Sequence, residues 1–260
     1  MFATVQALNA PTRFAPVVRH ALALTLACSI GCVAAQDARF QGDIGGMLTR
    51  SASPAAGVAA PHAVLPYVYG DWGRFYGRVD TFGVRALPWG QGHLEAAVRV
   101  STEGWSAADS AHPRAGDRAA PMPIGLGTFQ RTALGGVFAY AMHDPQSGGQ
   151  FGELNWAGKL DVGPVKLYPQ LGVQYRSADY VRHLYGIDTA QSQATGLSIY
   201  RPGASFTPMA TLQATVPLNG PWALQLQTRY RRLDDAVAHS PLVNRSSQVS
   251  GFAAVTYTLN

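Results

Sequence analysis

The feature that most constrains this chain is a repeated alternation of apolar and polar residues over segments of about ten residues. The clearest segment is 222–232, where one face carries Trp222, Leu224, Leu226, Thr228 and Tyr230 and the other carries Ala223, Gln225, Gln227, Arg229 and Arg231. Successive side chains of a β-strand point to opposite faces, so a period of two predicts a strand with one apolar face. Aromatic residues close both ends of that apolar face, as in strands that cross a bilayer between its two interfaces.

Clear alternation also runs through 154–162, 165–176, 206–216 and 249–259. Further candidate strands are 40–50, 62–72, 74–87, 92–102, 128–141 and 195–202, while 180–190 is either a strand or the lip of a loop. Strands of this length exceed the average of 5–6 residues in globular proteins and match the roughly 9–11 tilted residues that cross a bilayer. Because single-chain bacterial barrels have even strand numbers, we predict about 12 strands, with 10 as the alternative.

The composition favours a β-barrel embedded in a membrane over a soluble β-sandwich. Hydrophobic residues make up 47% of the chain and charged residues only 13%, about half of the roughly 25% that a soluble domain carries. Beyond residue 35, no apolar run reaches the roughly 18 residues of a membrane helix. Lipid cannot satisfy an open sheet edge, so the strands must close on themselves. The predicted fold is therefore all-β, a transmembrane antiparallel up-and-down β-barrel, with the polar segment 103–127 as a long extracellular loop.

The first 35 residues have the pattern of an export signal. Arg13 and Arg19 precede an apolar stretch over 21–35, and Val33-Ala-Ala35 supplies the small residues of a cleavage site before Gln36. We therefore predict a cleaved signal peptide over 1–35 and an outer-membrane β-barrel domain over 36–260. Such a chain is exported through the periplasm to the bacterial outer membrane, where lipid and lipopolysaccharide surround its wall.

Cleavage also removes both cysteines, Cys28 and Cys32, so the mature chain is expected to have no disulfide. The alternative is a lipoprotein acylated at Cys32, although Ser29 stands where such signals usually have Leu. The formal charge falls from +5 to +3 because Arg13 and Arg19 leave with the signal. The basic residues form no run of five or more, which argues against nucleic acid as a partner.

Catalytic candidates are few. Ser240 stands beside His239 and near Asp234 and Asp235, which permits a hydrolase hypothesis with Ser240 as the nucleophile. Adjacent strand residues point to opposite faces, however, and Pro241 favours a turn, so a polar loop is the preferred interpretation. The seven His residues are dispersed, without the spacing of a zinc site. We expect no enzyme activity, no metal and no cofactor.

Charged residues on the polar strand faces are candidates to line the lumen. They are Glu95, Arg99, Lys159, Asp161, Lys166, Arg176, Arg229 and Arg231. Two interpretations remain open: a pore whose charges set ion preference, or a network of charge pairs that fills a narrow lumen. The aromatic cluster Tyr67, Tyr69, Trp72, Phe75 and Tyr76 is interpreted as part of an interfacial girdle, with a partner or ligand patch as the alternative.

Four stretches spread along the chain carry a family resemblance. They are Val64-Leu-Pro-Tyr-Val-Tyr-Gly-Asp-Trp-Gly-Arg-Phe-Tyr76, Tyr185-Gly-Ile-Asp188 with Gln191 and Ser192, Gly196-Leu-Ser-Ile-Tyr-Arg-Pro-Gly203, and Tyr230-Arg-Arg-Leu-Asp-Asp-Ala236 with Ser240-Pro-Leu-Val243. In order and spacing they resemble the motifs of the MipA/OmpV family of outer-membrane proteins, also called MltA-interacting proteins. The matching residues are Pro66, Tyr67, Trp72, Gly73, Arg74, Phe75, Tyr185, Gly186, Gly196, Leu197, Tyr200, Pro202, Gly203, Arg232, Leu233, Asp235, Ala236, Ser240 and Pro241. The chain departs from the family pattern at its end, since it has Asn260 where the family usually has an aromatic residue.

The resemblance implies a scaffolding protein of the outer membrane. The member that gives the family its name is associated with a murein lytic transglycosylase and a penicillin-binding protein, and it links murein hydrolysis to murein synthesis in peptidoglycan remodelling. A small outer-membrane porin or channel for small solutes is the alternative, and an outer-membrane hydrolase is a minor third one.

Overall fold

The computed structural model describes residues 39–60 and 62–260. The predicted signal peptide over 1–35, with Cys28 and Cys32, lies outside the described residues and stays a prediction. Within the described ranges, no helix combines the length and the hydropathy that a membrane span needs.

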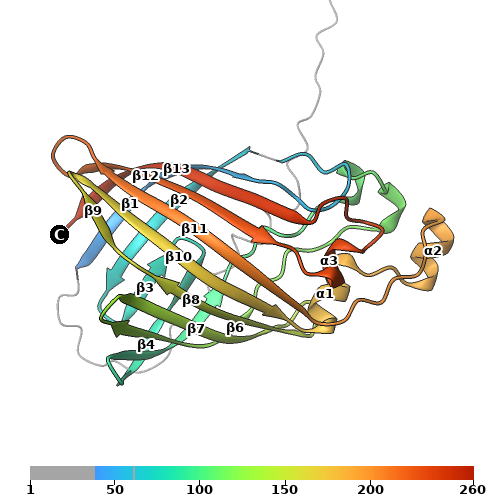
Figure 1. Ribbon diagram of the computed structural model, residues 1–260, viewed down its shortest axis with the longest axis horizontal. Coiled ribbons are helices and arrows are strands. Elements are labelled where there is room, and N and C mark those ends of the chain that lie inside the picture. Colours follow the sequence, from blue (N-terminus) through green and yellow to red (C-terminus); the bar gives the residue numbers. More distant parts are fainter. Residues whose placement is uncertain (1–38, 61) are drawn as a thin grey trace, which may run out of the picture. The chain divides into compact units, whose positions relative to one another are not determined.

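The described chain is built mainly from antiparallel strands (Figure 1). The strands are β1 Phe40–Ser51, β2 His62–Trp72, β3 Phe75–Arg78, β4 Thr81–Trp89, β5 Gly92–Arg99, β6 Ile124–Thr132, β7 Gly135–Asp144, β8 Gly149–Ala157, β9 Leu160–Val162, β10 Val165–Arg176, β11 Ser205–Pro217, β12 Trp222–Arg232 and β13 Ser247–Leu259. The helices are the 3-10 turns η2 Ala107–Asp109 and η3 Pro113–Ala115, and the α-helices α1 Ala178–Tyr185, α2 Thr189–Thr195 and α3 Asp235–Ala238.

The sheet closes into a barrel of 12 strands. Strands β1 to β8 pair in chain order, β8 pairs with β10, β10 to β13 continue as β10-β11-β12-β13, and the pairing of β13 with β1 closes the ring. The short β9 does not add a thirteenth position, because β8 and β9 pair with different stretches of the same strand, β10. The predictions of an all-β antiparallel barrel and of 12 strands are confirmed.

The number was right although three of the predicted strands were wrong, and segment 180–190, left open as a strand or the lip of a loop, belongs to the connection 177–204. Segment 74–87 is two strands, β3 and β4, and segment 128–141 joins the end of β6 to the start of β7. Their turns, Val79-Asp80 and Ala133-Leu134, lack the Gly and Asn that usually mark tight turns, and Val79 adopts a φ of 66° without being glycine. Segments 180–190 and 195–202 are not strands. Two strands were therefore missed and two segments were counted in excess, so the predicted total stayed at 12.

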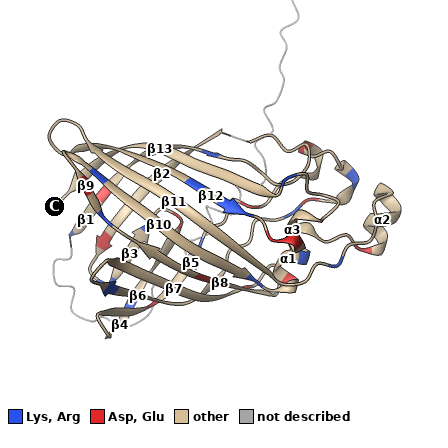
Figure 2. Ribbon diagram, viewed as in Figure 1, with Lys and Arg blue, Asp and Glu red and all other residues tan. Residues whose placement is uncertain are grey.

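The outer face of the wall is apolar along its length. Exposed large residues include Leu48, Val64, Leu126, Leu154, Leu171, Leu212, Leu226, Val249 and Val255. Trp222 and Tyr230 bracket this surface on β12, eight residues apart, which is about 26 Å along the strand and about 20 Å along the axis of a barrel with roughly 40° tilt. That span suits the roughly 25 Å apolar band of an outer-membrane barrel. Figure 2 shows few charged residues on the strands of the wall.

The two ends of the barrel differ in the length of their connections. The end that carries the start of β1 and the end of β13 has only short turns, 73–74, 90–91, 133–134, 163–164 and 218–221; we call it the turn end. The opposite loop end carries the long connections 100–123, 177–204 and 233–246, whose helices gather there in Figure 1. In bacterial barrels short turns face the periplasm and long loops face the exterior.

Candidate functional site in the capped lumen

The long loops form a packed cap with its own apolar core at the loop end. Trp105, from the connection 100–123, lies 5.7 Å from the ring of Tyr185 at the end of α1. The buried residues of this core that belong to loops and helices are Ala55, Trp105, Ala115, Tyr180, Val181, Leu184, Tyr185, Ile187, Leu233, Val237 and Leu242. Since these side chains come from four separate connections, their burial ties the loops into one unit.

Helix α1 joins the cap because its apolar residues have helical spacing. Tyr180, Val181, Leu184 and Tyr185 are all buried, and positions three and four apart lie on one face of a helix. Arg118 of the connection 100–123 holds the end of this helix by donating hydrogen bonds to the carbonyl oxygens of Gly186, at 2.8 Å, and His183, at 3.3 Å. Burial lowers the pKa of the Arg118 guanidinium, with an opposing effect of Asp188.

Three of the four family motifs meet in this cap. The Ser240 hydroxyl donates a hydrogen bond to the carbonyl oxygen of Tyr185 at 2.7 Å. Tyr200 donates from its hydroxyl to the carbonyl oxygen of Ala236 at 3.1 Å, and its backbone exchanges two hydrogen bonds with Ile187. The fourth motif, Pro66 to Phe75, forms the β2–β3 hairpin at the turn end. The remaining motif residues lie on the same cap segments: Gly186, Gly196, Leu197, Pro202, Gly203, Arg232, Leu233, Asp235 and Pro241.

The surroundings of Ser240 are those of a structural residue. Its side chain is 2% exposed, its hydroxyl hydrogen is directed at the Tyr185 carbonyl, and its oxygen accepts the backbone N–H of Leu242 at 3.2 Å. These contacts fit the polar-turn interpretation of this segment. Among the residues that the structure describes, no group of three His, Cys, Asp or Glu side chains could hold a metal ion.

Beneath the cap, the segment that follows β5 reaches into the lumen. Ser101, Thr102 and Glu103 line the internal cavity. The backbone N–H of Val100 donates to the carbonyl oxygen of Asp80 at 2.8 Å, and Trp105 exchanges two backbone hydrogen bonds with Arg118. We call residues 100–105 the luminal insert.

Glu103 holds the luminal insert to the opposite wall through two arginines. One carboxylate oxygen accepts from Nη2 of Arg176 at 2.6 Å and also from Nη1 of Arg231. Burial acts to raise the pKa of the Glu103 carboxyl, but the charges of Arg176 and Arg231 outweigh it and hold that pKa below its ordinary value. Glu103 is therefore an anion at neutral pH, bridging β10 and β12.

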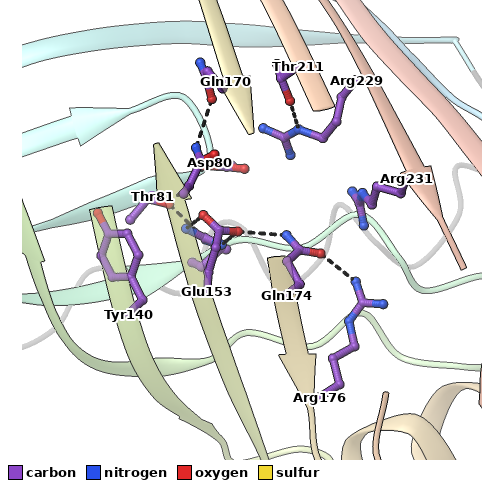
Figure 3. A network of polar contacts seen from close by, with 12 residues as sticks. Asp80, Thr81, Tyr140, Glu153, Gln170, Gln174, Arg176, Thr211, Arg229 and Arg231 are labelled. Carbon is purple, nitrogen blue, oxygen red and sulfur yellow. Dashed lines mark hydrogen bonds and ion pairs between the residues drawn. The ribbon is translucent and has the colours of Figure 1, made fainter. Parts of the chain in front are cut away.

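A second ion pair crosses the lumen beside the first. Arg99 of β5 donates to both carboxylate oxygens of Glu153 on β8, at 2.6 and 3.3 Å. Glu153 also accepts from the side chain of Gln174 at 2.8 Å, and Gln174 accepts from Arg176 at 3.0 Å (Figure 3). Because Arg176 also binds Glu103, the two ion pairs form one network across the lumen.

The cavity inside the barrel has a volume of about 380 Å³ and a lining of both polar and apolar side chains. It extends from Tyr180 in the cap to Tyr168, Thr215 and Gln225 in the turn-end half of the wall. Four of the candidate lumen residues line it: Arg99, Arg176, Arg229 and Arg231.

The structure places the other candidates elsewhere. Glu95 is buried, accepts a hydrogen bond from the Tyr140 hydroxyl at 2.7 Å, and contacts His93. Lys159 and Asp161 are exposed where β8 gives way to β9 and pair with each other at 3.3 Å, and Lys166 is also exposed.

Sequence reasoning missed the two acidic partners of this network. Glu153 shares the inward face of β8 with Phe151 and Asn155, so the alternation could have found it if the predicted strand had begun earlier than Leu154. Glu103 lies in a polar connection without periodicity, and nothing local indicates that this connection folds inward.

The aromatic cluster divides between the two faces of the wall. Trp72 and Phe75 are exposed at the turn end, as a girdle requires. Tyr67 is 1% exposed and Tyr76 is also buried, while Tyr69 lines the cavity, so the girdle prediction is wrong for the three tyrosines.

Comparison with known proteins gives a consistent result. A family model described as MltA-interacting protein MipA matches residues 44–259. The MltA-interacting protein of Escherichia coli (strain K12) is 30% identical over 132 residues, which cover 50% of this chain and 53% of that protein. The outer membrane protein OmpV of Vibrio cholerae is 29% identical over 142 residues, 54% of this chain and 55% of OmpV. The putative outer membrane protein YiaT of Escherichia coli O157:H7 is 24% identical over 219 residues, 82% and 89% of the two chains. The match thus spans about half the length of the first two of these relatives.

Proposed function

Because the chain belongs to the MltA-interacting protein MipA family, we propose that it is a closed barrel that anchors a murein lytic transglycosylase at the inner face of the outer membrane. The name of the Escherichia coli relative, MltA-interacting protein, is the reason for choosing this partner. A penicillin-binding protein is the proposed second partner, so that murein hydrolysis and synthesis are held together. In this role the chain itself carries out no reaction.

The observation that favours an anchor over an open pore is the closed loop end. The luminal insert crosses the space beneath the cap, and Glu103 fixes it to Arg176 and Arg231. Breaking a buried ion pair leaves uncompensated charge and costs about 3–5 kcal/mol. A free passage for solutes requires the insert to leave this position.

The turn end is the proposed docking face, because a periplasmic partner meets this end of the barrel. Leu134 in the β6–β7 turn is 78% exposed, and Leu218 before the β11–β12 turn is also exposed. Arg131 adds exposed positive charge three residues before Leu134. Lys166 is also exposed and pairs across the sheet with Thr215, three residues before Leu218. Exposed leucines with basic neighbours suit a protein partner with an apolar patch and acidic surroundings.

Site-specific cross-linking tests the anchor role. A photoreactive amino acid replaces Leu134 or Asn219 at the turn end and, as the control, Ser198 in the exposed part of the cap. In living cells, a cross-link to a lytic transglycosylase is expected from the turn-end positions and not from Ser198. Cross-links to that enzyme from Ser198 alone, or from none of the three positions, would contradict the proposal.

A small-solute channel is the second candidate, because a cavity of about 380 Å³ with several charged side chains runs below the cap. Planar-bilayer recording separates the two functions. An anchor gives no stable, discrete conductance with the intact chain, whereas a channel gives reproducible unitary steps that depend on ion type.

A further inference from the structure

The lumen gathers more positive than negative charge around one point of the cavity. Arg99, Arg176, Arg229 and Arg231 all line it, and Figure 3 shows the side chains of Arg176 from β10 and of Arg229 and Arg231 from β12. The acidic residues beside them are Glu103, Glu153 and Asp80. Glu103 and Glu153 are already held by ion pairs with Arg176, Arg231 and Arg99.

Arg229 is the arginine of this group that lacks a carboxylate partner within the described residues. Its Nε donates to the Thr211 hydroxyl at 3.2 Å, and no described carboxylate lies within ion-pair distance of its guanidinium. The Nε atoms of Arg176 and Arg231 are also buried without a hydrogen-bond partner in the described chain. Two acceptor atoms of cavity-lining residues, Oε2 of Glu103 and Oδ1 of Asn155, are in the same situation. The cluster therefore has spare N–H donors.

We propose that the lumen contains a binding site for a small oxyanion, a carboxylate or a phosphate, centred on Arg229 and extended by Arg231. A guanidinium presents its N–H groups in a planar fork that fits two oxygens of such an anion. The low dielectric of the lumen strengthens the attraction, and the cavity of about 380 Å³ gives a small oxyanion room beside these side chains.

The luminal insert shows that a carboxylate binds to arginines of this cluster. The carboxylate of Glu103 is an oxyanion, and it binds Arg176 of β10 and Arg231, which lines the cavity from β12 together with Arg229. In the proposed arrangement Glu103 is an internal competitor, which neutralises part of the cluster and leaves Arg229 to an external ligand. Removing its charge should therefore strengthen the binding of that ligand.

The test uses the full, folded barrel in dodecyl maltoside, a detergent without phosphorus. Inorganic phosphate is titrated at constant ionic strength, and binding is read from the width of the phosphorus NMR line. Arg229→Gln is expected to weaken phosphate binding by about tenfold or more, because the anion loses a partner for charge-assisted hydrogen bonds. Arg131→Gln is the matched control, because Arg131 is exposed near the turn end and does not line the cavity.

A second variant tests the competition. Glu103→Gln should bind phosphate more tightly than the unmodified chain, and heat-dependent gel mobility checks that each variant is folded. A parallel titration with labelled acetate, read on its carbon line, distinguishes a phosphate site from a carboxylate site. The proposal is overturned if neither anion binds, if Arg229→Gln binds like Arg131→Gln, or if folded Glu103→Gln binds no better. No enzyme is present in these titrations, so their failure is separate from failure of the anchor role.

Discussion

Glu103 is the single residue on which the closed lumen depends most. Its carboxylate is the contact that joins the luminal insert to both β10 and β12. The cost of placing this charge inside the barrel is offset by two guanidinium groups, which is why its pKa lies below the ordinary value despite its burial. Ser240 has the corresponding role in the cap, where one hydroxyl joins α1 to the segment after α3.

Replacing Glu103 by Gln should lower the free energy of unfolding by about 3 kcal/mol near pH 7, because Arg176 and Arg231 lose their counter-charge. A carboxyl whose pKa is lower in the folded than in the unfolded state stabilises the protein above the unfolded pKa, and this stabilisation is lost as the pH falls through the folded pKa. The difference between Glu103→Gln and the unmodified chain should therefore be constant from about pH 7 to pH 5. It should shrink below about pH 4, the region where an ordinary Glu becomes protonated.

Urea-induced unfolding in detergent at a series of pH values measures this difference. Lys159→Gln removes a charge from an exposed pair and is the control, with an expected change of less than about 1 kcal/mol. A difference for Glu103→Gln that persists unchanged at pH 3 would mean that the carboxylate charge is not the stabilising group.

Replacing Ser240 by Ala should loosen the cap by about 1–3 kcal/mol, because the buried Tyr185 carbonyl and the Leu242 N–H lose their partner. Limited proteolysis of the folded barrel measures this loosening through the rate of cleavage in the long connections. Ser198→Ala, at an exposed position of the cap, is the matched control. Equal cleavage rates for the two variants would show that the Ser240 contacts do not hold the cap.

At the scale of single elements, β12 shows how one strand serves two environments. Its outward residues run from Trp222 through Leu226 to Tyr230 and are exposed, as a lipid-facing row requires. Its inward residues Gln225, Arg229 and Arg231 line the cavity. Helix α1 differs from a strand of the wall, because its apolar residues recur at helical spacing and the cap covers them.

The two faces of β12 should respond oppositely to a new charge. Leu226→Arg places a cation midway between Trp222 and Tyr230 on the lipid face and should cost about 2–4 kcal/mol. Gln227→Arg, one residue further along, enters the lumen and should be tolerated. The yield of folded protein in lipid vesicles, followed by gel mobility, measures both; similar losses for the two variants would contradict the assigned faces.

At the scale of the whole molecule, the sequence left the state of the lumen undecided, and the structure shows that the lumen is covered at its loop end. Twelve strands surround a cavity with a mixed polar and apolar lining, and the cap with its luminal insert covers one end of it. The chain is an outer-membrane protein, and the closure of its barrel depends on loops. A channel function requires these loops to leave the lumen, whereas the proposed anchor function does not.

Removal of the connection 100–122, which carries the luminal insert and part of the cap, should convert the closed barrel into a conducting one. The ends of β5 and β6 lie together, since Val98 pairs with Ile124, so residues 100–122 can be replaced by a short glycine turn. We expect stable unitary steps in planar bilayers from this variant and none from the intact chain. A variant that lacks 190–195, in the exposed helix α2, is the control and should stay closed. Silence of the insert-free, folded barrel would mean that something else blocks the lumen.

Most of the wall could be predicted from the sequence, because each strand carries its two-faced pattern within about ten residues. The bounds of β2, β10 and β12 agree with the pattern, and four of the lumen-facing arginines were identified in the same way. The turns at Val79-Asp80 and Ala133-Leu134 were missed because neither contains the Gly or Asn that usually marks a tight turn. Helix α1 was missed because short apolar spacing fits both a strand and a helix. Helix α2 has no buried residue and so no apolar face that could predict it.

The sequence by itself determined the class of fold, because a period of two with little charge and no helix-length apolar run leaves a closed β-wall in lipid as the solution. Only the tertiary structure decided whether the lumen is open. That depends on Glu103 meeting Arg176 and Arg231, residues 73 and 128 positions away along the chain. Contacts over such distances leave no periodic trace, since their geometry is set by the closure of the barrel around them and by the packing of the cap above.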